Sequence, residues 1–170
     1  MANVFLICGI PGAGKDWFVE NKIDNGKVVS FDDIRIKLFK KGNSPEKWRS
    51  LSTHELYDKA WAWCNSTKAD LMKPLIEEVK ELIKDGKKPC IANTMVNKKS
   101  RAKMLEDLKR AGITKVGCYY LMVDSKTALE RNANRDSKKL ADDIVLRFAK
   151  DQAIPTKDEG FEFVKVVINK

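Results

Sequence analysis

A glycine-rich segment that contains one lysine lies near the start of the chain, directly after a run of apolar residues. Residues 9–16 read Gly-Ile-Pro-Gly-Ala-Gly-Lys-Asp and match the pattern G-x-x-x-x-G-K. In this pattern backbone N–H groups surround the β-phosphate of a nucleoside triphosphate, while the lysine reaches toward the γ-phosphate at the N-terminus of a helix. The segment therefore predicts ATP binding, and the expected contacts are Gly9, Gly12, Ala13, Gly14, Lys15 and Asp16.

The last residue of this loop departs from the pattern. A serine or threonine normally stands there and provides a hydroxyl ligand for Mg²⁺, whereas this chain has Asp16. Carboxylate oxygens are also magnesium ligands, so we expect Asp16 to bind the metal. The alternative is a degenerate loop that has lost its metal chemistry.

Phosphoryl transfer also needs a carboxylate that accepts the proton of the attacking hydroxyl group. Asp32 and Asp33 follow the second strand-like run, and the C-terminal ends of parallel strands face the same crevice as the phosphate loop. We predict Asp32 as the general base, and Arg35, one helical turn later, as a contact of the substrate phosphate. The alternative is that one or both aspartates only cap the helix.

The third strand-like run ends in Asn93-Thr94, where P-loop proteins usually keep a carboxylate near Mg²⁺. The missing acid at Asn93 and the additional acid at Asp16 suggest a linked exchange, which would keep the total charge around the metal. This exchange is a hypothesis that paired substitutions test.

Two arginines, Arg131 and Arg135, are four residues apart, a spacing that predicts one shared face of a helix. Guanidinium groups there would stabilise the γ-phosphoryl group as charge moves onto it, so we predict both as catalytic residues together with Lys15 and Asp32. Simple surface arginines are the alternative. The polar, cationic segment 132–140 is predicted to form a lid.

Strand-like and helical patterns alternate along the chain. Apolar runs predict strands over residues 4–8, 27–31, 89–92, 115–123 and 161–168. Helical patterns cover residues 16–23, 32–39, 98–111, 125–132 and 141–152, and a longer stretch runs from a capping box at 52–55 to 85–86 with Pro74 as a kink or break. This alternation predicts a parallel sheet in one α/β domain over residues 1–170.

The formal net charge of +9 indicates a polyanionic partner. The charge gathers in two regions that we expect near the mouth of the phosphate site: Lys98, Lys99, Arg101, Lys103, Lys109 and Arg110, and Arg131, Arg135, Lys138, Lys139, Arg147 and Lys150. Solvated lysine-rich helices are the alternative. The sequence shows no secretory leader and no run of about 20 apolar residues, so we expect a cytoplasmic protein without a membrane span.

The remaining reactive side chains suggest no further chemistry. The four cysteines show no C-x-x-C spacing and are expected to be buried, reduced thiols. We expect His54 at the surface, and at least one of Trp61 and Trp63 in the core, because the two point to different faces of a helix.

Taken together, Gly9 to Lys15, Phe31-Asp32-Asp33-Ile34-Arg35, Ala92-Asn93-Thr94 and Arg131-x-x-x-Arg135 resemble the kinase domain of phage-type polynucleotide 5′-hydroxyl kinases. The resemblance spans most of the chain in the right order. It implies a three-layer P-loop kinase fold with helices on both faces of a five-stranded sheet of order 2-3-1-4-5, together with ATP and Mg²⁺ as cofactors. It also implies substrate contacts from Arg35, Asn93 and Thr94, and a lid arginine at Arg135.

This chain differs from that family at Asp16 and Asn93, and we expect it to act without the phosphatase domain that some members carry. We therefore expect transfer of the γ-phosphoryl group to a nucleic-acid hydroxyl, in the first place a 5′-hydroxyl end of DNA or RNA. The alternative acceptors are a hydroxymethylated base in DNA, a mononucleotide or another small molecule. An ATP-binding module without catalysis is the alternative from another class. The oligomeric state stays open.

Overall fold

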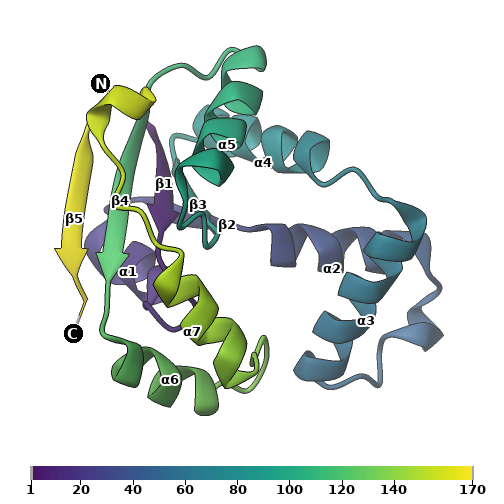
Figure 1. Cartoon of the computed structure of the whole chain (residues 1–170). Coiled ribbons are helices and arrows are strands. Elements are labelled where there is room, and N and C mark those ends of the chain that lie inside the picture. Colours follow the sequence, from purple (N-terminus) through teal and green to yellow (C-terminus); the bar gives the residue numbers. More distant parts are fainter. Residues whose placement is uncertain (1, 170) are drawn as a thin grey trace.

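The central sheet contains five parallel strands in the order β2-β3-β1-β4-β5 (Figure 1). The computed structural model describes residues 2–169. Its strands are β1 (Val4–Cys8), β2 (Gly26–Val29), β3 (Lys88–Ala92), β4 (Val116–Met122) and β5 (Val164–Ile168). In the middle of the sheet, Leu6 of β1 lies beside Ile91 of β3 and Cys118 of β4. The predicted strand order is confirmed.

Helices cover both faces of the sheet, because side chains of each strand alternate between the two faces. On one face Val4 and Leu6 of β1 pack in the same core as α4 (Met72–Lys84) and α5 (Lys98–Arg110). On the other face Phe5 and Ile7 pack with α1 (Lys15–Lys22), α6 (Ser125–Ala133) and α7 (Asp142–Lys150). The three-layer arrangement is confirmed, and it directs the loops after β1 and β3 to one edge of the sheet.

Helices α2 (Phe31–Gly42) and α3 (Thr53–Thr67) pack against each other and project from the sheet (Figure 1). Residues 43–52 connect them and include the short helix η1 (Pro45–Lys47). The Trp63 ring meets Phe39 edge-on at 6.1 Å between centroids, whereas Trp61 is 50% exposed. Trp63 is half-buried against Phe39, and neither tryptophan belongs to the two cores that cover the sheet, so the prediction of a core tryptophan is wrong.

Two predicted element boundaries are wrong for identifiable reasons. Strand β2 ends at Val29 and α2 begins at Phe31, because the Ser30 hydroxyl accepts a hydrogen bond from Asp33 N at 3.2 Å and caps the helix. The long helical stretch breaks at Lys68, whose φ is 51°, and not at Pro74. Pro74 lies in the first turn of α4, where its missing N–H removes no helical hydrogen bond.

The basic residues of α5 do not all face the phosphate site. Arg101 is fully buried and its guanidinium donates to both carboxylate oxygens of Glu159, at 2.8 and 2.9 Å. Lys109 and Arg110 lie at the end of α5 that returns the chain to the start of β4, at the opposite edge of the sheet from the phosphate loop (Figure 1). The expectation for this helix is therefore wrong for these three residues.

Other expectations about the chain agree with the structure. All four cysteines are buried and free, and His54 lies at the surface, 3.1 Å from Asp58. Within residues 2–169, no helix combines the length and hydropathy of a membrane span.

Candidate active site

The phosphate loop lies between β1 and α1 and needs glycine at two positions. Gly12 and Gly14 have φ angles of 87° and 84°, which residues that carry a side chain rarely adopt. A Cβ atom at Gly12 would lie 2.6 Å from the Ala128 carbonyl oxygen, and one at Gly14 would lie 2.5 Å from Asn169 Nδ2. Gly14 is the N-cap of α1 and no side chain caps this helix, so its first N–H groups are left for an anion.

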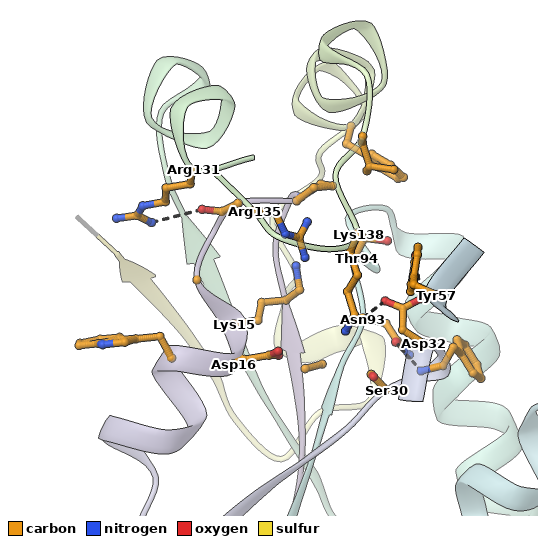
Figure 2. A pocket seen from close by; sticks show the side chains of 18 of the residues that line it. Lys15, Asp16, Ser30, Asp32, Tyr57, Asn93, Thr94, Arg131, Arg135 and Lys138 are labelled. Atoms are coloured by element: carbon orange, nitrogen blue, oxygen red, sulfur yellow. Dashed lines mark hydrogen bonds and ion pairs between the residues drawn. The ribbon is translucent and has the colours of Figure 1, made fainter. Parts of the chain in front are cut away.

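Lys15 lies in the cradle that the loop forms. Its Nζ donates to the carbonyl oxygens of Gly9 and Ile10, at 3.0 and 3.2 Å. Burial, together with the positive charge of Arg135, lowers the pKa of Lys15 to about 8. Figure 2 shows the Lys15 ammonium pointing toward the Arg135 guanidinium on one side of the pocket. Two cations that converge in this way favour the binding of an anion between them.

The loop opens into a cavity of about 570 Å³. Its walls bring together most of the predicted site residues, namely Gly12, Gly14, Lys15, Asp16, Asp32, Arg35, Asn93, Thr94, Arg131 and Arg135. Gly9 and Ala13 do not line it: Gly9 N donates to the Thr94 carbonyl at 3.1 Å, and Ala13 N donates to the Ile10 carbonyl at 3.0 Å. These two residues therefore stabilise the loop through backbone hydrogen bonds and form no part of the cavity wall.

Asp32 lies across the cavity from Lys15, in the first turn of α2. Its Oδ1 accepts hydrogen bonds from Arg35 Nη1 at 3.0 Å and from the Tyr57 hydroxyl at 3.1 Å. Lys138 Nζ lies 3.8 Å from Oδ2. Because Ser30 caps the helix, Asp32 and Asp33 are both released from the capping role that the sequence left open. The Asp32 side chain is 29% exposed, so a substrate can reach it.

Two buried donors lie on this side of the cavity without a partner in the described part of the chain. They are Arg35 Nε and Asn93 Nδ2. Asn93 Oδ1 accepts a hydrogen bond from Phe31 N at 3.1 Å, which fixes the amide so that it presents its N–H₂ group. A buried donor without an acceptor is costly, so both atoms fit a bound ligand that supplies oxygen acceptors.

The segment between α6 and α7 crosses the cavity as the sequence predicts for a lid (Figure 2). Asn132 is fully buried and bonds Leu140 twice, from Nδ2 to the carbonyl at 2.7 Å and from Leu140 N to Oδ1 at 3.0 Å. This pair joins the two ends of the segment, so that Arg135 and Lys138 are held over the cavity.

Arg131 is placed differently from Arg135. Its Nη1 donates to the carbonyls of Gly12 and Asn169, at 3.3 and 3.4 Å, and Figure 2 shows the guanidinium pointing away from Lys15. Asn169 Nδ2 in turn donates to the Ala13 carbonyl at 2.6 Å. In this arrangement Arg131 and Asn169 fasten the outer side of the phosphate loop.

Asp16 is exposed in the first turn of α1, and its carboxylate points into the pocket below Lys15 (Figure 2). Residues 2–169 contain no cluster of three or more acidic, histidine or cysteine side chains that would hold a metal by themselves. Mg²⁺ in phosphoryl-transfer sites is bound by one or two carboxylates together with substrate phosphates and water. One carboxylate at this position therefore fits the metal, and Asn93, which presents a donor, does not supply a ligand.

Several residues of the cavity were not predicted. Ser30, Tyr57 and Lys138 contribute polar groups, and Trp17, Phe31, Leu140, Ile144 and Phe148 contribute apolar or aromatic surface. Tyr57 belongs to α3, whose start is marked by the Ser52–Glu55 capping box, but no local pattern tells that this helix returns to Asp32. The sequence places Lys138 among the basic residues of its region and predicts no contact with Asp32 for it.

Comparisons with known proteins agree with the fold. A family model described as an AAA domain matches residues 4–153, and the chain belongs to this family. No curated protein sequence matches the chain.

Three solved structures illustrate the likeness. A putative kinase from Chloroflexus aurantiacus has a TM-score of 0.60 at 12% identity, over 98% of this chain and 85% of the other. A sugar kinase from Janibacter sp. HTCC2649 has a TM-score of 0.56 at 15% identity, over 98% and 86%. A gluconokinase from Sinorhizobium meliloti 1021 has a TM-score of 0.51 at 14% identity, over 96% and 82%. At these identities the likeness shows a shared fold, in agreement with the parallel sheet and the phosphate loop described above.

Proposed function

We propose that this protein is an ATP- and Mg²⁺-dependent kinase that phosphorylates a hydroxyl group of a nucleic acid, in the first place the 5′-hydroxyl end of DNA or RNA. One observation carries the proposal. Lys15 and Arg135 converge on an anion site on one side of the cavity, and the Asp32 carboxylate faces the same cavity from the other side (Figure 2). Phosphoryl transfer needs these two sides together.

In the proposed reaction the acceptor oxygen forms a bond to the γ-phosphorus of ATP, and the bond from that phosphorus to the β–γ bridging oxygen breaks. The proton of the acceptor hydroxyl passes to Asp32, and ADP leaves. Lys15 and the loop amides hold the phosphates, and Arg135 stabilises the charge that develops on the transferred group. Mg²⁺, held by Asp16, would neutralise part of the phosphate charge.

The acceptor side supports a substrate that carries phosphate. Arg35 Nε and Asn93 Nδ2 are buried donors without partners in the described chain, and Thr94 and Lys138 line the same region. Arg35 and Thr94 would bind the phosphate next to the acceptor hydroxyl, with Asn93 beside them. The net charge of +9 favours a polyanion.

The test is label transfer from γ-labelled ATP in Mg²⁺. The panel contains 5′-hydroxyl DNA, 5′-hydroxyl RNA, their 5′-phosphorylated controls, hydroxymethylated duplex DNA and mononucleotides. We expect label on 5′-hydroxyl ends and a steep loss of this activity as salt rises. Label on the 5′-phosphorylated controls, the duplex or a mononucleotide would contradict the 5′-hydroxyl end as acceptor and identify another acceptor in its place.

A matched pair of variants separates catalysis from binding in the same assay. Asp32→Asn removes the proposed base, whereas Asp33→Asn changes the neighbouring carboxylate, which is not part of the cavity wall. We expect transfer to be lost only in Asp32→Asn. ATP binding without transfer to any acceptor in the wild type would instead identify a non-catalytic ATP-binding module.

A further inference from the structure

The two oxygens of the Asp32 carboxylate have unequal surroundings. Oδ1 accepts two hydrogen bonds, from Arg35 Nη1 at 3.0 Å and from the Tyr57 hydroxyl at 3.1 Å. Oδ2 accepts no hydrogen bond from any residue between 2 and 169, and Lys138 Nζ lies 3.8 Å from it. A carboxylate held at one oxygen by two donors cannot rotate freely, so the other oxygen is the one presented to the cavity.

Tyr57 reaches Asp32 from a different part of the fold. It lies in the second turn of α3, while Asp32 lies in the first turn of α2. Burial and the nearby Asp32 charge raise the pKa of Tyr57 to about 12, so its hydroxyl remains protonated near neutral pH. It can therefore donate to the Asp32 carboxylate near neutral pH.

We propose that Tyr57 is a positioning residue for phosphoryl transfer, whose hydroxyl holds Oδ1 of Asp32 so that Oδ2 alone receives the proton of the acceptor. The inference rests on the proposed function, since it assumes that Asp32 is the base. Tyr57 itself touches neither the transferred group nor the acceptor in this account. Its contribution is the orientation and the ionisation of the carboxylate.

The other charged groups around Asp32 set the background for any pH effect. They are Asp33 and Arg35 on α2, Lys138 and Arg135 on the lid, and Lys15 on the phosphate loop. All of them remain in a Tyr57→Phe variant, which removes one oxygen and keeps the ring. The variant loses one donor to Oδ1, and this loss disfavours the ionised form of the carboxylate.

The first test is the kinetics of Tyr57→Phe. We expect kcat to fall on the order of ten- to hundredfold, because a hydrogen bond to a charged group is lost, with the KM for ATP unchanged. The ascending limb of the pH profile of kcat should move to higher pH. Tyr120→Phe is the matched control, since the Tyr120 hydroxyl is bonded to Gln152 at 2.8 Å, outside the cavity, and it should leave that limb in place.

The second test needs no turnover. ¹³C NMR of carboxyl-labelled protein follows the titration of Asp32, assigned with Asp32→Asn, in the wild type and in Tyr57→Phe. A higher pKa in the variant supports the inference, and identical titrations overturn it whatever the kinetics show. If Asp32→Asn is inactive and Tyr57→Phe behaves like the wild type, this inference alone is overturned. If Asp32→Asn is fully active, the assignment of Asp32 as the base is overturned as well.

Discussion

The nucleotide half of the cavity comes from one continuous segment, residues 9–16, whereas the acceptor half is assembled from four separate parts of the chain. Asp32 and Arg35 come from α2, Tyr57 from α3, Asn93 and Thr94 from the loop after β3, and Lys138 from the lid. The strand order of the sheet, the packing of α3 against α2 and the Asn132–Leu140 hydrogen bonds bring these parts together.

The two halves also differ in how their polar groups are satisfied. In the nucleotide half Lys15 is bonded to two carbonyls, and Arg131 and Asn169 bond the outer side of the loop. In the acceptor half, Arg35 Nε and Asn93 Nδ2 are buried without a partner in residues 2–169. Lys15, Arg131 and Asn169 are thus bonded within the protein, while the acceptor half holds two buried donors that lack an oxygen acceptor in the described residues.

The largest expected effect comes from the lid. Arg135→Ala should lower kcat on the order of 10³- to 10⁵-fold, because an arginine that stabilises the charge of the transferred group contributes that much. Arg131→Ala is the comparison, and its loss should be smaller, since its guanidinium bonds the loop carbonyl of Gly12. Single-turnover label transfer measures both. Equal losses would contradict the separate placement of the two arginines.

A substitution in the acceptor half should lower the rate of transfer and leave nucleotide binding unchanged. Asp32→Asn is expected to lower kcat on the order of 10²- to 10⁴-fold, the usual contribution of a general base, with the dissociation constant of ATP unchanged. Kinetics and calorimetry on the same preparation measure the two quantities. A parallel loss of ATP affinity would show that the two halves are not separable in this way.

The metal hypothesis links the halves through Asp16 and Asn93. Without Mg²⁺, a carboxylate about 4 Å from a phosphate oxygen costs about 4 kcal/mol at an effective dielectric constant of about 20, so chelation of the metal should weaken ATP binding by up to about 10³-fold. Asp16→Ser should lose turnover, and Asn93→Asp added to it should restore part of it. Higher turnover of Asp16→Ser alone, or no recovery in the double variant, would remove the hypothesis.

The smallest expected effect is the pH dependence of ATP affinity, which arises from Lys15 in the nucleotide half. The pKa of Lys15 is lowered to about 8, and a bound polyanion favours the charged ammonium and raises this pKa. ATP affinity should therefore be constant below about pH 8 and fall up to tenfold for each pH unit above it, with proton uptake on binding. Calorimetry at pH 8.5 in buffers of different ionisation enthalpy measures this uptake, and a buffer-independent enthalpy would contradict it.

The same difference between the halves explains how far the sequence could be interpreted. The G-x-x-x-x-G-K pattern is local, and alternating strands and helices limit the topology, so the loop, the strand order and the lid were predictable. Asp32, Arg35, Asn93 and Thr94 could be placed because each follows a strand that ends at the same edge.

Other features depend on packing that no local pattern records. The contact between Tyr57 and Asp32 depends on how α3 packs against α2, and the outward direction of Arg131 depends on Asn169 near the end of the chain. The burial of Arg101 likewise depends on Glu159, 58 residues away along the chain. Helical spacing alone gave Arg131 and Arg135 the same face, but α6 ends at Ala133 and Arg135 lies beyond it. The clustering of charge alone placed all the basic residues of α5 near the phosphate site.

The account depends most directly on whether a phosphate loop that ends in Asp16 binds a metal-bound triphosphate. Isothermal titration of the wild-type protein with magnesium-ATP tests this, with Lys15→Ala as the control. We predict a saturable heat with a dissociation constant below about 1 mM, and a much weaker signal in the control. No heat at millimolar magnesium-ATP would contradict the account.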